Sequence, residues 1–192
     1  MTEGSDLKSI ATRLYDRAME LDSLRFGDFK LSSGQKSTYY FDGRMLSTDP
    51  EGADLISRAF SIAMDDAGVE AFGGPTVAAV PIVGALALRS YMDGKKRTGF
   101  FVRPEQKEHG AGKQIEGNLR PGMKVGVFDD TISTGGSLFP AIDAVEAIGC
   151  DVVLVMAILN RHQGGDVELE RRGFPFFKLW ESTPDGKITI AV

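Results

Sequence analysis

Apolar residues recur at helical spacing in four stretches of the chain. Between residues 6 and 21 they fall three or four positions apart, which predicts an amphipathic helix. A second helix is expected from Pro50, which Asp49 precedes, to Asp66, because proline is well tolerated at the first helical position. Two further helices are expected over residues 81–94 and 137–148.

Short, nearly continuous apolar runs alternate with these helices. They occupy residues 69–74, 98–102, 123–128, 151–159 and 174–180. Continuous apolar strands separated by helices indicate a parallel sheet that is covered on both faces. We therefore expect an α/β fold with a doubly wound, mostly parallel sheet. Residues 26–42, which are rich in turn-forming and aromatic residues, are expected to be extended or hairpin-like.

A polar segment, residues 103–118, interrupts this alternation between two expected strands. Connections of this length without secondary structure are uncommon in compact domains and are usually functional or disordered. The segment contains Arg103, Lys107, Glu108 and His109, and glycines follow them. We predict a mobile lid that carries ligand-binding groups.

Length and charge narrow the class of protein. A chain of 192 residues suits a single domain with a full core. The net charge of −5 indicates no general affinity for nucleic acids. Residues 95–124, however, hold eight Lys or Arg against three Glu. This local positive charge suits an anionic small ligand, although a solvated basic face would give the same composition.

The single cysteine and the N-terminus exclude other classes. Cys150 is expected to be an inert buried thiol, and one cysteine excludes a disulfide framework or a Cys-based zinc site. The N-terminus lacks the pattern of a signal sequence, and no apolar run approaches the length of a membrane span. The expected location is the cytoplasm, with no membrane partner.

The stretch VGVFDDTISTGGS, residues 125–137, carries the clearest chemistry. An apolar run ends in two adjacent carboxylates, and a loop rich in hydroxyls and glycines follows. The amides of such a loop and the positive end of the next helix can hold a phosphate. Carboxylates can bind vicinal hydroxyls or a hydrated Mg²⁺, so a ribose 5-phosphate would satisfy both halves. The alternative is a tight turn without a ligand; Walker and GxGxxG motifs are absent.

This pattern resembles the 5-phosphoribosyl 1-diphosphate (PRPP) signature of type I phosphoribosyltransferases. Residues 26–42, FGDFKLSSGQKSTYYFD, resemble the N-terminal signature of the orotate phosphoribosyltransferase family. Residues 103–117, RPEQKEHGAGKQIEG, resemble the catalytic loop of that family, and GGPTVAAVPI (73–82) resembles its pyrophosphate loop. With Leu159-Asn160-Arg161, the resemblance spans roughly residues 20–165.

The resemblance implies transfer of the phosphoribosyl group of PRPP to orotate, giving orotidine 5′-monophosphate and pyrophosphate. It implies catalytic roles for Arg103, Lys107 and His109, which would contact the pyrophosphate. The implied PRPP site adds Asp129, Asp130, Thr131, Ile132, Ser133, Thr134, Gly135, Gly136 and Ser137 to these three. The implied orotate site consists of Ser133, Arg161, Tyr40 and Phe41.

The resemblance also implies a metal, a partner and a domain plan. Mg²⁺ would be held mainly by PRPP, near Asp129 and Asp130. A homodimer would share loop 103–118 across its interface. One phosphoribosyltransferase domain, residues 1–192, would combine an N-terminal helix and strand hood of about residues 1–48 with an α/β core, residues 49–192.

Three positions depart from the family pattern. Ser32, Pro104 and Ala78 stand where many members have a basic residue, which bears on PRPP affinity more than on identity. Two rival functions stay open at this point. One is a type I phosphoribosyltransferase for another base, and the other is a non-catalytic PRPP-sensing regulator.

Overall fold

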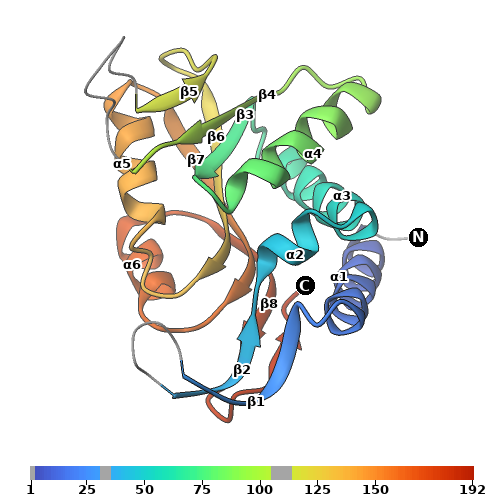
Figure 1. The fold of residues 1–192 in the computed structure, drawn as a ribbon. Coiled ribbons are helices and arrows are strands. Elements are labelled where there is room, and N and C mark those ends of the chain that lie inside the picture. Colours follow the sequence, from blue (N-terminus) through green and yellow to red (C-terminus); the bar gives the residue numbers. More distant parts are fainter. Residues whose placement is uncertain (1–2, 31–35, 105–113) are drawn as a thin grey trace.

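The computed structural model describes residues 3–30, 36–104 and 114–192 and shows an α/β fold (Figure 1). Ser32, Lys107 and His109 lie outside the described residues. The helices are α1 (Glu3–Glu20), α2 (Gly43–Ser47), α3 (Pro50–Asp66), α4 (Ala79–Met92), α5 (Leu138–Ala147) and α6 (Gly165–Arg172). The strands are β1 (Leu24–Lys30), β2 (Lys36–Phe41), β3 (Ala71–Pro75), β4 (Thr98–Val102), β5 (Ile115–Gly117), β6 (Lys124–Ile132), β7 (Asp151–Asn160), β8 (Phe176–Ser182) and β9 (Ile188–Ile190).

The central sheet has the order β5-β4-β3-β6-β7-β8-β9. Its five inner strands are parallel, and β5 and β9 pair antiparallel at the two edges. Helices α1, α3 and α4 contribute to one buried cluster, while α5 and α6 contribute to a second. The alternation of side chains along β6 explains this division, because Val125 and Val127 belong to the second cluster and Phe128 to the first. The predicted doubly wound, mostly parallel sheet is confirmed.

The N-terminal segment packs against this core. β1 and β2 pair antiparallel, with Leu24 opposite Phe41, which agrees with the extended or hairpin-like structure expected for residues 26–42. The Trp180 indole is fully buried and donates to the Ala11 carbonyl oxygen at 3.0 Å, which ties α1 to β8. The proposed boundary between a hood and a core, near residue 48, stays a prediction.

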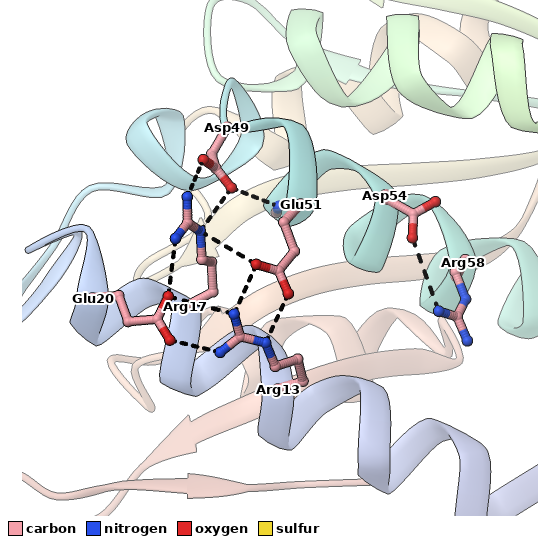
Figure 2. Close-up of polar contacts among 8 residues, drawn as sticks. Arg13, Arg17, Glu20, Asp49, Glu51, Asp54 and Arg58 are labelled. Carbon is pink, nitrogen blue, oxygen red and sulfur yellow. Dashed lines mark hydrogen bonds and ion pairs between the residues drawn. The ribbon is translucent and has the colours of Figure 1, made fainter.

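Charged side chains join α1 to the start of α3 (Figure 2). Arg17 donates to both carboxylate oxygens of Asp49, at 2.6 and 3.0 Å. Arg13 makes an equivalent fork with Glu51, at 2.7 Å to each oxygen. Glu20 accepts from both arginines. Asp49 also caps α3, since its side chain accepts from the Gly52 amide at 3.0 Å, so one carboxylate starts a helix and anchors its neighbour.

The structure differs from the sequence predictions in the length and number of elements. β6 was expected to end at residue 128 but continues to Ile132, because β7 pairs with it as far as Asn160. The expected loop 103–118 is shorter than predicted, since residues 115–117 form β5 beside β4. The elements α2, α6 and β9 were not predicted. Among the described helices, none is both long enough and apolar enough to cross a bilayer.

Candidate active site

A cleft of about 570 Å³ lies beyond the carboxyl end of β6. Its walls come from the end of β2 and α2, from the segment before α4, from the loop between β6 and α5, and from the residue after β7. The lining residues are Tyr40, Phe41, Asp42, Arg44, Val77, Ala78, Asp130, Thr131, Ser133, Thr134, Gly135, Gly136, Ser137, Leu138 and Arg161. The fold therefore brings together most of the residues predicted to bind ligand.

The loop between β6 and α5 has a backbone geometry that requires glycine at position 135. Gly135 has a φ of 81°, and a Cβ there would lie 2.2 Å from the Phe139 ring. The Gly135 carbonyl accepts from the Phe139 amide at 2.9 Å, and the Ser133 carbonyl accepts from the Gly165 amide at 2.9 Å. These bonds fix the loop against α5 and α6 while leaving its other side facing the cleft.

The N-terminus of α5 is open toward the cleft. No side chain caps this helix, and no acidic residue lies in its first turn. Ser137, at the capping position, instead donates its hydroxyl to Asp129 Oδ2 at 2.7 Å. The positive end of the helix dipole therefore stays available to an anion, as a phosphate site requires.

The two aspartates at the end of β6 face opposite sides of the sheet. Asp129 is 5% exposed and accepts from the Ser137 hydroxyl and, at 3.0 Å, from the Asp130 amide. Burial raises its pKa, and the charge of Asp130 raises it further. Asp129 does not line the cleft, so its expected contact with a ribose stays a prediction.

Asp130 presents its carboxylate to the cleft. Burial raises its pKa, while the Thr131 amide, which donates to it, opposes the rise. A Cβ at position 43 would lie 2.5 Å from Asp130 Oδ2, so Gly43 lets α2 approach the carboxylate closely. Ile132, another predicted PRPP contact, is buried and lies outside the cleft lining.

Arg161 lies at the far wall of the cleft, directly after β7. Its amide donates to the Ile132 carbonyl at 2.8 Å, and its guanidinium lies 5.3 Å from the centre of the Tyr39 ring. Its Nε is buried and has no hydrogen-bond partner among the described residues. Because the Nε is buried, a contact between Arg161 and an anionic group near Tyr40 and Phe41 would be made by the outer nitrogens of its guanidinium.

The sequence interpretation missed Asp42 and Arg44, which both line the cleft. Their side chains pair with each other at 2.9 Å, and Asp42 also caps α2. Asp42 was the last residue of the quoted aromatic signature, and Arg44 follows two positions later. The chain sequence DGR, in which a capping residue is followed by glycine and a cation, was the available signal.

Arg103 lies beside the cleft in a smaller cavity of about 180 Å³, which shares Gly136 and Ser137 with it. Its Nε donates to Glu116 Oε1 at 3.0 Å. Its amide donates to the Gln114 carbonyl at 2.9 Å, which closes the base of the connection between β4 and β5. The roles expected for Lys107 and His109 stay predictions.

The described residues contain no group of three or more His, Cys, Asp or Glu side chains that could hold a metal. Within the described cleft the carboxylates are Asp42, which is paired with Arg44, and Asp130. Mg²⁺ usually keeps several waters and binds through one or two carboxylates together with substrate phosphates. The donor set fits an ion that arrives with a diphosphate.

Comparisons with known proteins show which proteins this chain is similar to. No family model matches the chain. An orotate phosphoribosyltransferase of Aquifex aeolicus is 39% identical over 168 residues, which cover 86% of this chain and 92% of that protein. The crystal structure of Mycobacterium tuberculosis H37Rv orotate phosphoribosyltransferase with Fe(III) dicitrate aligns with a TM-score of 0.76 and 30% identity, covering 88% of this chain and 94% of that chain. Its complex with PRPP aligns with a TM-score of 0.72 and 28% identity over the same shares.

Proposed function

Because the chain belongs to the orotate phosphoribosyltransferase family, we propose that it transfers the 5-phosphoribosyl group of PRPP to orotate and that the reaction takes place in this cleft. The family makes the chain a pentosyltransferase of pyrimidine biosynthesis. The observation that carries the assignment to this cleft is the combination of an uncapped helix end, a cleft-facing Asp130 and an incompletely paired Arg161.

The phosphoribosyl half of the substrate fits the side of the cleft beside α5. Its 5-phosphate would bind the loop 131–137, where backbone amides and the helix dipole favour an anion. Asp130 would accept hydrogen bonds from the ribose hydroxyls, and Asp129 would hold the loop through Ser137. The complex of the M. tuberculosis relative with PRPP supports this part of the proposal.

The orotate half fits the wall formed by Arg161 and the end of β2. A guanidinium can hold a carboxylate through two parallel hydrogen bonds, which suits the carboxylate of orotate. Ser133 would add a hydroxyl, and Tyr40 and Phe41 would contact the base. Ala78 leaves no cation at its position, while Arg44 and Arg161 supply positive charge elsewhere in the lining.

Catalysis would consist mainly of orientation and stabilisation of charge. Orotate N1 attacks C1′ as the bond to pyrophosphate breaks, so positive charge develops on the ribose and negative charge on the leaving group. Arg103, Lys107 and His109 would stabilise the pyrophosphate. When bound, Mg²⁺ would supply further positive charge to the diphosphate oxygens. Closure of the segment 103–118 would exclude water and so limit hydrolysis of PRPP.

An exposed apolar stripe supports the proposed homodimer. Val80, Leu88, Tyr91 and Met92 lie along α4 with exposed fractions of 38, 62, 83 and 65%. Their spacing places them on one side of the helix, and Val77, which is 66% exposed, continues the stripe to the cleft. An apolar surface of this kind beside a ligand cleft marks an interaction site. We assign it to a second copy of this chain.

The test is a spectrophotometric assay of orotate consumption with PRPP and Mg²⁺. We expect loss of the orotate absorbance only when both substrates are present, with release of pyrophosphate. EDTA should abolish turnover, and excess Mg²⁺ should restore it. A panel of purine bases and uracil serves as the control for the acceptor, and transfer to one of them without transfer to orotate would refute the assignment. The expected cytoplasmic location stays a prediction.

A further inference from the structure

The turn that follows β7 is held by a polar network that the proposed reaction does not use. Asn160, the last residue of β7, is fully buried. Its Oδ1 accepts from the His162 amide at 3.1 Å, and its Nδ2 donates to Asp166 Oδ2 at 3.1 Å. His162 has a φ of 50°, in the left-handed region, so the chain reverses sharply here. Arg161 lies at the apex, between the two residues that the network fixes.

The His162 side chain joins this turn to two other elements. Its Nδ1 lies 2.5 Å from Asp166 Oδ2 in α6, and its Nε2 lies 3.2 Å from Glu181 Oε2 in β8. Glu181 also pairs with Lys178 at 2.9 Å. Burial opposes the charged form of Asp166, but hydrogen bonds from Asn160 and His162 hold its pKa below the usual value. Asn160 Nδ2 also lies 3.3 Å from His162 Nδ1, so the ring contacts β7, α6 and β8.

Arg161 itself has few other restraints. Its guanidinium stacks near Tyr39, and its Nε has no partner among the described residues. Arg161 lines both the cleft and a second cavity of about 730 Å³, and the second cavity is also lined by His162 and Glu181. The direction in which the guanidinium enters the cleft therefore depends on how firmly its neighbours in the chain are held.

We propose that His162 is a positioning residue for Arg161. By bridging Asp166 and Glu181, it fixes the turn so that the Arg161 fork meets the carboxylate of the acceptor. The inference rests on the proposed function, because it assumes that Arg161 binds that carboxylate. It predicts that loss of the ring harms recognition of the acceptor far more than recognition of PRPP, which binds at the other side of the cleft.

The test compares His162→Gly with the wild-type enzyme in steady-state assays. Glycine adopts the left-handed conformation without strain, so the variant removes the imidazole ring while its backbone can still form the turn. We expect the KM for orotate to rise about tenfold to a hundredfold, since small misplacement of a binding group has effects of this size, while the KM for PRPP changes less than about twofold. Added imidazole can enter through the second cavity and should lower the KM for orotate again.

Matched variants separate positioning from folding. Asp166→Asn and His162→Asn should also raise the KM for orotate. The circular dichroism spectrum of each variant is compared with that of the wild type to show that it is folded. Asp185→Asn, which lines the same second cavity but has Lys187 and Thr183 as its partners, should leave both KM values unchanged. An unchanged KM for orotate in His162→Gly, equal rises in both KM values, or no response to imidazole would overturn the proposal. Wild-type enzyme that does not convert orotate would instead refute the proposed function.

Discussion

At the scale of single residues, the structure separates two aspartates that are adjacent in sequence. Side chains alternate along a strand, so Asp129 shares its face with Val127 under α5 and Asp130 shares its face with Phe128 toward α2. Asp129 therefore meets Ser137, whereas Asp130 meets the cleft. The two carboxylates therefore have different surroundings, although they are adjacent in the motif.

The buried charge of Asp129 should cost stability in the ligand-free protein. Its pKa is raised in the folded state, so folding retains a proton that the unfolded chain has already released above about pH 4. This group's contribution is therefore most favourable in acid and is lost as the pH rises through the folded-state pKa. We expect the free energy of unfolding of Asp129→Asn, measured by urea denaturation, to exceed that of the wild type by more at about pH 8 than at about pH 5. Asp16→Asn, an exposed carboxyl on α1, is the control, and a pH-independent difference would contradict the prediction.

Arg161 offers a second test at this scale. Arg161→Ala removes the guanidinium fork, so we expect the KM for orotate to rise about a hundredfold with little change in the KM for PRPP. Arg161→Lys should recover only a small part of the loss, because an ammonium group cannot form two parallel bonds to a carboxylate. Steady-state kinetics with each substrate varied would measure this. Arg171→Ala, an exposed arginine paired with Glu168, is the control. Equal damage to both KM values would argue against the orotate role.

The sequence predicted much of the lining of the candidate site but not the residues that hold the lining in place. Arg161, Tyr40 and the loop 131–137 were identifiable because they lie in spaced motifs. The role of Asp129 in holding Ser137 could have been inferred from strand alternation, had β6 been extended past residue 128. Asp42 and Arg44 were missed, because α2 is too short to show a helical period and its DGR start was not interpreted as a helix cap.

At the scale of elements, long periodic segments were predicted well and short ones were not. The bounds of α3 and β4 agree with the sequence pattern, since proline, a capping aspartate and apolar runs mark them locally. β5 contains three residues and depends on pairing with β4, so no local signal reveals it. Cys150 is buried as expected, and burial raises the pKa of its thiol.

The junction of α1 and α3 gives a prediction at this scale. Asp49→Ala removes a helix cap and the partner of Arg17, so we expect the free energy of unfolding to fall by about 1–2 kcal/mol. Asp49→Asn keeps a side chain that can cap the helix, so its free energy of unfolding should fall by less. Hydrogen bonds from Arg17 lower the pKa of Asp49 to about 2. The stabilisation by the Asp49 carboxylate is therefore present above about pH 4 and disappears as the pH falls from there toward about 2.

Urea denaturation at neutral pH and in acid measures these differences. Asp54→Ala is a matched control, because Asp54 lies on the same helix and forms ion pairs with Arg89 of α4 at 2.5 Å and with Arg58 at 3.9 Å, but it does not cap α3 (Figure 2). A loss in Asp54→Ala as large as that in Asp49→Ala would show that the cap is not the source of the stability.

At the scale of the whole molecule, the proposed homodimer gives a prediction. If the α4 stripe is the dimer interface, Leu88→Glu should place a charge in it and weaken association by about a hundredfold or more. Light scattering after size exclusion would detect the monomer, and turnover should fall with it because the segment 103–118 would act across the interface. Val167→Glu, which changes a residue of similar exposure on α6, should stay dimeric. A dimeric Leu88→Glu would place the interface elsewhere.

The hydroxyl of Ser137 links ligand binding to the integrity of α5. Since that hydroxyl donates to Asp129, the first turn of the helix lacks its usual side-chain cap, and the proposed substrate phosphate would take that role. The substrate would then stabilise the start of the helix in addition to being the molecule on which the enzyme acts. Amide exchange in the first turn of α5 should slow when inorganic phosphate or PRPP is added, and the enzyme would be most rigid only while it is loaded.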